Sequence, residues 1–204
     1  MTDGRRIRGM DAEQRKALRR RQLLDSALEL FASQGYAATP IEQLCQHAFV
    51  GTKGFYETFD SREACYLALL GEITERTEAR MDACLAEDAD ETVLVDAFAD
   101  ALVGDPRVAQ VAFGHGMAVS PALERARREN RRWAAGFVLR VWDAGGVTPA
   151  PGVDPRVAAR GLIGGMFDLI ADWLVESASS DTAPLREALA CFYRVVRAGV
   201  GRPQ

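Results

Sequence analysis

The segment from Thr39 to Phe59 restricts the possible folds more than any other stretch, because it predicts two short helices joined by a tight turn. Thr39 is a suitable N-cap for the first helix, and Pro40 fits the first helical position, where its missing N–H costs nothing. Glu42 is spaced to complete a capping box with Thr39. Apolar residues at helical spacing follow, and that pattern breaks before Gly51.

The second short helix, expected at about residues 52–58, has an exposed face of unusual composition. That face carries the hydroxyls of Thr52, Tyr56 and Thr58 and the ammonium group of Lys53, with no acidic residue among them before position 57. Such a face can enter a DNA major groove and donate to phosphates and base edges. An ordinary amphipathic helix in a small bundle is the alternative interpretation.

Composition and charge limit the class of protein. The chain has 204 residues, of which 48% are hydrophobic, so it can form a substantial core, and its formal net charge is −4. Positive charge is nevertheless concentrated at the start, because residues 1–21 contain eight basic and three acidic side chains. Arg5, Arg6 and Arg8 either form a basic arm that reaches a minor groove or belong to a solvated tail. No apolar run approaches the roughly 18 residues of a membrane span, and none follows these arginines as in a signal peptide.

Residues 20–70 resemble the DNA-binding domain of the TetR (tetracycline repressor) family of bacterial transcriptional regulators. Two pieces of sequence carry the resemblance, LLDSALELFASQGYAATPIEQL and AFVGTKGFYETFDSREACYLAL. It implies three helices for DNA binding, followed by a helical domain that binds an effector and dimerises. The residues expected to contact DNA are Thr39, Gly51, Thr52, Lys53, Gly54, Tyr56, Thr58 and Arg62.

Three positions depart from the family pattern. Where the family usually has Gly and then Ser around the turn, this chain has Phe49 and Gly51. Phe49 is therefore expected to strain the backbone or to alter the turn, and Gly51 can cap a helix only without a side-chain acceptor. Arg62 stands where the family often has Lys, and either can bind phosphate. Thr52 and Lys53 are the candidates for base edges, and Lys53 can reach guanine.

Prolines that directly follow capping residues predict where helices of the remaining chain begin. Asp105-Pro106, Ser120-Pro121 and Asp154-Pro155 each place a capping residue before a proline at the first helical position. Helices are expected at 15–34, 61–85, 91–103, 106–117, 121–144, 155–178 and 184–199, beside the two short ones. The predicted fold is all-α with about nine helices. A three-helix helix-turn-helix domain is expected in residues 1–60, and a helical effector-binding and dimerisation domain in residues 61–204.

Large apolar side chains in the second half indicate either a core or a ligand pocket between helices. The candidates for ligand contact are Phe98, Phe113, His115, Met117, Trp133, Phe137 and Phe167, which as a set favour a small apolar or aromatic effector. Gly114 and Gly116 flank His115, so a helix break there would let the imidazole orient a ligand; a frayed helix end is the alternative. Arginines alternate with acids in residues 120–132, which favours a solvated helix face over a nucleic-acid patch.

The last two predicted helices have the pattern of a homodimer interface. Its candidate residues are Gly161, Gly165, Leu185, Leu189, Phe192 and Val196. The glycines permit close helix approach and the others form an apolar stripe, although each element alone can be the core of one protomer. In the family the corresponding helices of two subunits form a four-helix bundle, and a two-fold dimer reads two DNA half-sites.

These features together predict a cytoplasmic bacterial DNA-binding regulator, most simply a repressor, that does not enter a membrane. Its expected partners are double-stranded operator DNA, a small apolar or aromatic effector and a second copy of the chain. The alternatives are a helical adaptor without DNA binding and a small-molecule enzyme on a helical scaffold. His47 and His115 have no catalytic motif around them, and the four cysteines lack metal-ligand spacing. No catalytic residue, metal or cofactor is therefore expected.

Overall fold

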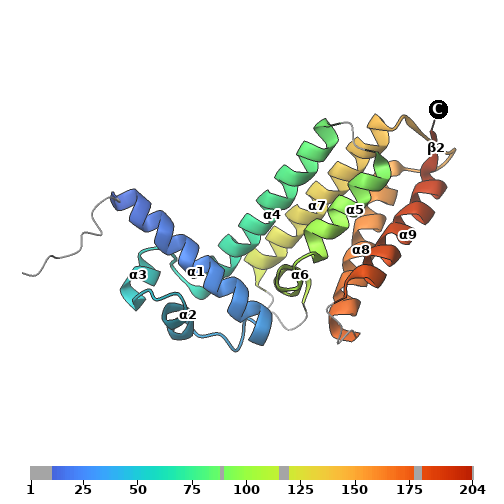
Figure 1. Ribbon diagram of the computed structural model, residues 1–204. Helices are drawn as coiled ribbons and strands as arrows, with labels where there is room; N and C mark the ends of the chain where they lie inside the picture. The colour runs from blue at the N-terminus through green and yellow to red at the C-terminus, as the bar shows by residue number, and fades with distance from the viewer. Residues whose placement is uncertain (1–10, 88–89, 115–119, 177–180, 204) are drawn as a thin grey trace, which may run out of the picture. The chain divides into compact units, whose positions relative to one another are not determined.

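The computed structural model describes residues 11–87, 90–114, 120–176 and 181–203 (Figure 1). Across these ranges the chain forms nine α-helices and one two-stranded ladder, which confirms the predicted all-α class. Backbone contacts group the chain into two compact units, Met1–Leu69 and Leu70–Gln204. The division falls inside a long helix, whereas the predicted domains meet after residue 60.

The first unit contains α1 (Ala12–Gln34), α2 (Ile41–His47), α3 (Thr52–Tyr56) and the beginning of α4 (Arg62–Ala86). Its core forms because α1 places Leu24 and Phe31 on one buried stripe, and Leu44 and Phe55 meet it from the two short helices. Gly35 ends α1 with a φ of 83°, a conformation that glycine adopts without strain. The helix-turn-helix arrangement predicted for this region is therefore present.

The second unit contains the rest of α4, α5 (Glu91–Val103), α6 (Pro106–Phe113), α7 (Pro121–Ala144), α8 (Pro155–Glu176) and α9 (Ala183–Val200). Here α8 packs against α6, α7 and α9, while α9 also packs against α5 (Figure 1). Buried side chains from these helices form one continuous core, in which Met81, Leu162, Ile163 and Leu189 are among the most completely enclosed.

Three helices of the second unit begin at the predicted proline junctions. The side chain of Asp105 accepts from the backbone N–H of Arg107 at 2.9 Å, and Ser120 Oγ accepts from the N–H of Leu123 at 3.1 Å. Asp154 starts α8 in the same way. These caps satisfy backbone donors that a helix leaves unpaired in its first turn, so local sequence is sufficient to set where α6, α7 and α8 begin.

A short antiparallel ladder was not predicted. It joins β1 (Val147–Pro149) to β2 (Gly201–Pro203), with Thr148 opposite Arg202. A Cβ atom at Gly201 would overlap the carbonyl oxygen of Thr148, so glycine is required at that crossing. Three residues on each side are too few for a visible alternating pattern, and the pairing depends on helices that bring the two segments together.

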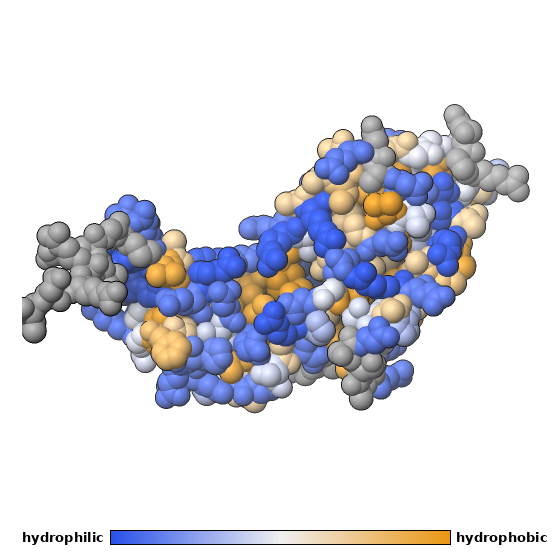
Figure 2. All heavy atoms as spheres, viewed as in Figure 1, coloured by the Kyte–Doolittle hydropathy of each residue, from blue (hydrophilic) through white to orange (hydrophobic). Residues whose placement is uncertain are grey.

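Hydrophilic residues cover most of the face seen in Figure 2, interrupted by groups of hydrophobic residues. Among the helices of the described ranges, none is long and apolar enough to cross a membrane.

Candidate functional site

The exposed face of α3 is the candidate DNA-reading surface of the first unit. Thr52, Lys53 and Tyr56 are exposed on this five-residue helix, and Gly51 precedes it as an N-cap without a side-chain hydrogen bond. The Lys53 side chain is 91% exposed, and its ammonium nitrogen lies 3.9 Å from Glu57 Oε1. So long and exposed an ion pair holds a side chain weakly. The ammonium group is therefore available to a phosphate or a base edge.

Buried contacts fix α3 from its opposite side. Phe55 is fully enclosed, and a Cβ atom on Gly54 would lie 3.0 Å from Val50 Cγ1 and 3.1 Å from Arg19 Cδ. Thr58 Oγ1 donates to the carbonyl oxygen of Gly54 at 2.8 Å. Gly54 and Thr58 are thus half-buried packing residues, which corrects the prediction that Thr58 lies on the exposed face. Direct contact of either residue with DNA stays a prediction.

Thr39 has a different role from the one predicted. It is completely buried, and its hydroxyl donates to the carbonyl oxygen of Gly35 at 2.8 Å while it accepts from Gln34 Nε2 at 3.0 Å. Pro40 is the N-cap of α2 and has no side-chain cap. The predicted capping box is therefore wrong. The turn at Gly35 brings its carbonyl to Thr39, so the hydroxyl closes the loop after α1 and is not exposed to phosphate.

Arg62 was predicted to bind phosphate, and the structure gives its guanidinium group a local partner instead. Its Nη1 donates to the carbonyl oxygen of Thr39 at 2.8 Å, and its guanidinium carbon lies 4.3 Å from the centroid of the Tyr36 ring. Tyr36 in turn packs against Phe31 and Tyr66 at centroid distances of 5.6 and 5.5 Å. Arg62 therefore connects the loop before α2 to the first turn of α4, and contact of its guanidinium group with phosphate stays a prediction.

The turn between α2 and α3 contains the strain that its sequence predicts. Phe49 has a φ of 54°, and no other non-glycine residue in the described ranges has a positive φ. Left-handed backbone costs such a residue about 1–2 kcal/mol. Its side chain is 95% exposed, so burial does not offset that cost. The N–H of Val50 nevertheless donates to the carbonyl oxygen of Cys45 at 3.0 Å, and the two helices keep their tight connection.

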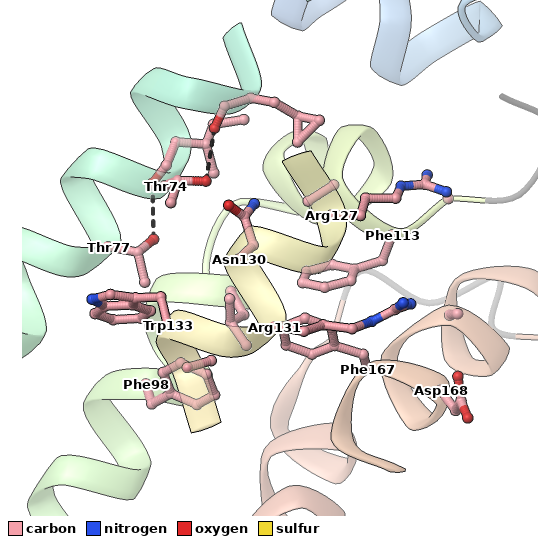
Figure 3. Close-up of a pocket in the computed structure, with 17 residues that line it drawn as sticks. Thr74, Thr77, Phe98, Phe113, Arg127, Asn130, Arg131, Trp133, Phe167 and Asp168 are labelled. Atoms are coloured by element: carbon pink, nitrogen blue, oxygen red, sulfur yellow. Dashed lines mark hydrogen bonds between the residues drawn. The ribbon is translucent and has the colours of Figure 1, made fainter. Parts of the chain in front are cut away.

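The second unit contains a partly open cavity of about 340 Å³ among α4, α5, α6, α7 and α8 (Figure 3). This volume lies near the lower end of the range for small-molecule pockets. Of the predicted ligand contacts, Phe98, Phe113, Trp133 and Phe167 line the cavity. The rings of Phe113 and Phe167 meet edge to face, with centroids 4.8 Å apart.

The other predicted ligand contacts do not line this cavity. Phe137 is 4% exposed and lies in the core, where its ring stacks on Trp133 with centroids 5.7 Å apart. It does not line this cavity, and its contact with a ligand stays a prediction. His115 and Met117 lie outside the residues that the structure describes. The helix break predicted near them begins at Gly114, where α6 ends.

Polar residues of the cavity were missed by sequence reasoning. They are Thr74, Thr77, Arg127, Asn130, Arg131 and Asp168. Arg127 and Arg131 belong to the stretch interpreted as a solvated helix face, and four-residue spacing on α7 does place them on one side. Only the packing of α7 against its neighbours shows that this side borders a cavity. The sequence did contain a sign of this cavity, because Asn130 and Trp133 follow Arg127 at three-residue spacing on α7.

The predicted dimer residues separate into two groups. Leu185 and Leu189 are buried in the core of the protomer, which corrects their assignment to an interface. A Cβ atom on Gly165 would lie 2.7 Å from Phe192 Cε1, so this glycine permits close approach of α8 and α9 within one chain. Gly161 is exposed and Val196 is half-buried. Both remain candidates for contact with a second chain.

Thiol and metal chemistry has little support in the described part of the chain. Burial raises the pKa of the Cys65 thiol to about 12 and also raises the pKa of Cys45. Cys191 is exposed on α9. Within the described ranges, no group of three or more His, Cys, Asp or Glu side chains is placed to hold a metal ion.

Comparison with known proteins agrees with the geometry of the first unit. The model of the tetR family of bacterial regulatory proteins matches residues 23–69. TcmR, an HTH-type transcriptional regulator of Streptomyces glaucescens, is 37% identical over 75 residues, which are 36% of this chain. The matched part spans 33% of the length of TcmR.

Solved structures extend the similarity of fold to both units. The fatty acid degradation regulator FadR from Bacillus halodurans has a TM-score of 0.72 at 15% identity, over 90% of this chain and 97% of its own. FadR from Bacillus subtilis in complex with stearoyl-CoA gives 0.71 at 20% identity, over 88% and 98%. NalD, the secondary repressor of the MexAB-OprM multidrug efflux pump in Pseudomonas aeruginosa, gives 0.66 at 19% identity, over 92% and 98%. With residues 23–69 matched by the family model and the helices of both units matched in fold, this chain resembles the TetR family of bacterial regulatory proteins over its helix-turn-helix segment.

Proposed function

We propose that this protein is a sequence-specific DNA-binding transcriptional regulator, most simply a repressor, whose operator affinity changes with a small ligand. The observation that carries the proposal is the exposed face of α3, where Thr52, Lys53 and Tyr56 stand clear of the core. Hydroxyl and ammonium donors on a short helix of this kind suit base edges and phosphates. A regulator of this class works in the bacterial cytoplasm, where its DNA is.

The proposal includes a homodimer. A single five-residue helix offers little surface, whereas two copies related by a two-fold axis can read half-sites about 34–36 Å apart. Large apolar side chains exposed on the last two long helices support an interface there. Val157 and Val175 on α8 and Val195 on α9 are 64, 66 and 65% exposed.

The cavity of the second unit supports ligand control. FadR from Bacillus subtilis, which shares the fold, is bound to stearoyl-CoA in its solved structure. In this chain α4 contributes Thr74 and Thr77 to the cavity lining. Arg62, in the first turn of the same helix, donates a hydrogen bond to the carbonyl oxygen of Thr39 in the loop before α2. Suppose that α4 has two positions, one that suits DNA binding and one that does not. A ligand that binds the protein more tightly in one of these positions changes the affinity for DNA by the ratio of its two affinities, and by no more.

Lys53→Ala tests the DNA-reading role directly. Loss of a base or phosphate contact is expected to weaken operator binding by about 1–3 kcal/mol. If the lost contact is to phosphate, the slope of log affinity against log salt concentration should also become shallower by about one. The measurement is a fluorescence anisotropy titration against DNA from the upstream region of the gene, with nonspecific competitor, at two salt concentrations. Arg156→Ala is the control, because it removes an exposed positive charge from the second unit. Equal affinity of Lys53→Ala and wild type at fixed salt would refute the role.

A further inference from the structure

We infer that the cavity of the second unit binds an organic monocarboxylate, with its apolar body among the aromatic rings and its carboxylate at Arg127 and Arg131. This inference rests on the proposed function, in which the cavity takes the effector. The aromatic lining alone predicts a neutral ligand, whereas the two arginines predict one that carries a negative charge.

The cavity has two chemically different ends. Figure 3 shows Trp133, Phe98 and Thr77 at one end and the guanidinium groups of Arg127 and Arg131 at the other. The edge-to-face pair of aromatic rings from α6 and α8 lies between them. A ligand that fills this space therefore passes from an apolar region to a cationic one.

Within the described ranges, the positive charges of the two arginines have no acidic partner. Neither Arg127 nor Arg131 forms an ion pair or hydrogen bond with another residue in the described ranges. By contrast, Arg80 and Arg186 pair with Asp100, the former at 2.8 Å. Like charges four residues apart on a helix repel each other, and Arg127 is half-buried. A bound carboxylate would relieve that repulsion and accept charge-assisted hydrogen bonds.

Asp168 is the one acidic residue among the described lining residues, so it must be set against the two arginines. It is exposed and lies on α8. The lining therefore keeps an excess of one positive charge, which matches a single carboxylate. The same excess disfavours a cationic ligand.

The two threonine hydroxyls at the opposite end of the cavity have no hydrogen to offer a carboxylate. Thr74 Oγ1 donates to the carbonyl oxygen of Leu70 at 2.9 Å, and Thr77 Oγ1 donates to that of Ile73 at 2.9 Å. With their hydrogens used inside α4, both hydroxyls face a ligand only as acceptors. The cationic donors of the lining belong to Arg127 and Arg131, so the carboxylate is assigned to their end of the cavity.

The test compares ligands that share one body and differ in charge. The purified full-length protein is titrated by calorimetry, without DNA, with 2-naphthoate, 2-naphthamide and 2-naphthylmethylamine, and then with decanoate, decanamide and decylamine. For at least one body, we expect the carboxylate to bind about tenfold to a hundredfold more tightly than the amide, the equivalent of a charge-assisted hydrogen bond. The amines should bind more weakly than the amides.

Substitutions then assign the preference to residues. Arg127→Gln and Arg131→Gln should each reduce the ratio of carboxylate to amide affinity while leaving amide affinity close to wild type. Arg128→Gln is the matched control, because Arg128 is exposed on the same helix and does not line the cavity. It should leave the ratio unchanged.

Three results would overturn the inference. They are equal affinity for carboxylate and amide, a preference that survives both arginine substitutions, and no carboxylate binding up to about 1 mM for either body. The DNA titration described above is independent of these ligands. Specific DNA binding with no carboxylate preference would refute only this inference, whereas carboxylate binding that leaves DNA affinity unchanged would refute only the proposed regulation.

Discussion

Replacing Gly165 by alanine probes the close approach of α8 and α9. The new Cβ atom would lie 2.7 Å from Cε1 and 2.8 Å from Cζ of the Phe192 ring. Carbon atoms pack best at about 3.5–4.0 Å, so either the ring must turn or the helices must separate. Overpacking of this kind costs about 1–3 kcal/mol.

Helix propensity acts in the opposite direction. Alanine is favoured over glycine inside a helix by about 0.5–1 kcal/mol. The net expectation for Gly165→Ala is therefore a loss of about 0.5–2 kcal/mol in unfolding free energy. For a chain of this length that corresponds to a fall in Tm of about 2–4 °C per kcal/mol.

The assay is urea and thermal unfolding followed by circular dichroism, with Gly136→Ala as the matched control. Gly136 lies within α7, and a Cβ atom there would meet nothing within 4 Å, so alanine should stabilise by about 0.5–1 kcal/mol. In a Phe192→Leu background, Gly165→Ala should lose most of its cost, because the clashing ring is gone. Two protein concentrations separate folding from dimerisation.

The reasoning would be refuted if Gly165→Ala proved as stable as Gly136→Ala. A loss of stability that increased on dilution would instead place Gly165 at an interface between two protomers. The first outcome would mean that Phe192 yields without cost, and the second would restore the role expected from sequence.

Phe49→Asn should stabilise the protein by about 0.5–1 kcal/mol in thermal unfolding, because asparagine adopts positive φ more readily; no gain would show that the turn is unstrained. At pH 8 an aromatic disulfide reagent should label Cys65 only after denaturation, since Cys65 is buried and its pKa is raised to about 12; rapid labelling of Cys65 in the folded protein would contradict its burial. Tyr193→Phe should cost about 1–3 kcal/mol, because the buried indole N–H of Trp142 would lose its acceptor at 3.1 Å; unchanged urea unfolding would argue against that bond.

Local sequence was a good guide to the helices. The proline junctions at residues 105–106, 120–121 and 154–155 set three helix starts, because a capping side chain and a proline act within one turn. Thr39-Pro40 has the same local pattern and behaves differently. The carbonyl of Gly35 competes for its hydroxyl, and that partner is placed by the turn that ends α1.

The candidate sites depended on tertiary structure to different degrees. The exposed residues of α3 could be predicted, since a five-residue helix with one buried aromatic leaves its other side to solvent. The roles of Gly54 and Arg62 could not, because each is defined by a contact with a residue distant in sequence: Arg19 for the glycine and Thr39 for the arginine.

For the cavity and the interface, sequence supplied the residue types and the structure decided their positions. Phe137 and Phe167 are alike in sequence, yet one lies in the core and the other lines the cavity, because α7 and α8 present them to different neighbours. Helical periodicity states which residues share a face, and it is a local property of the backbone. Whether that face meets a core, a cavity or solvent depends on the packing of other helices, and only the tertiary structure determines this.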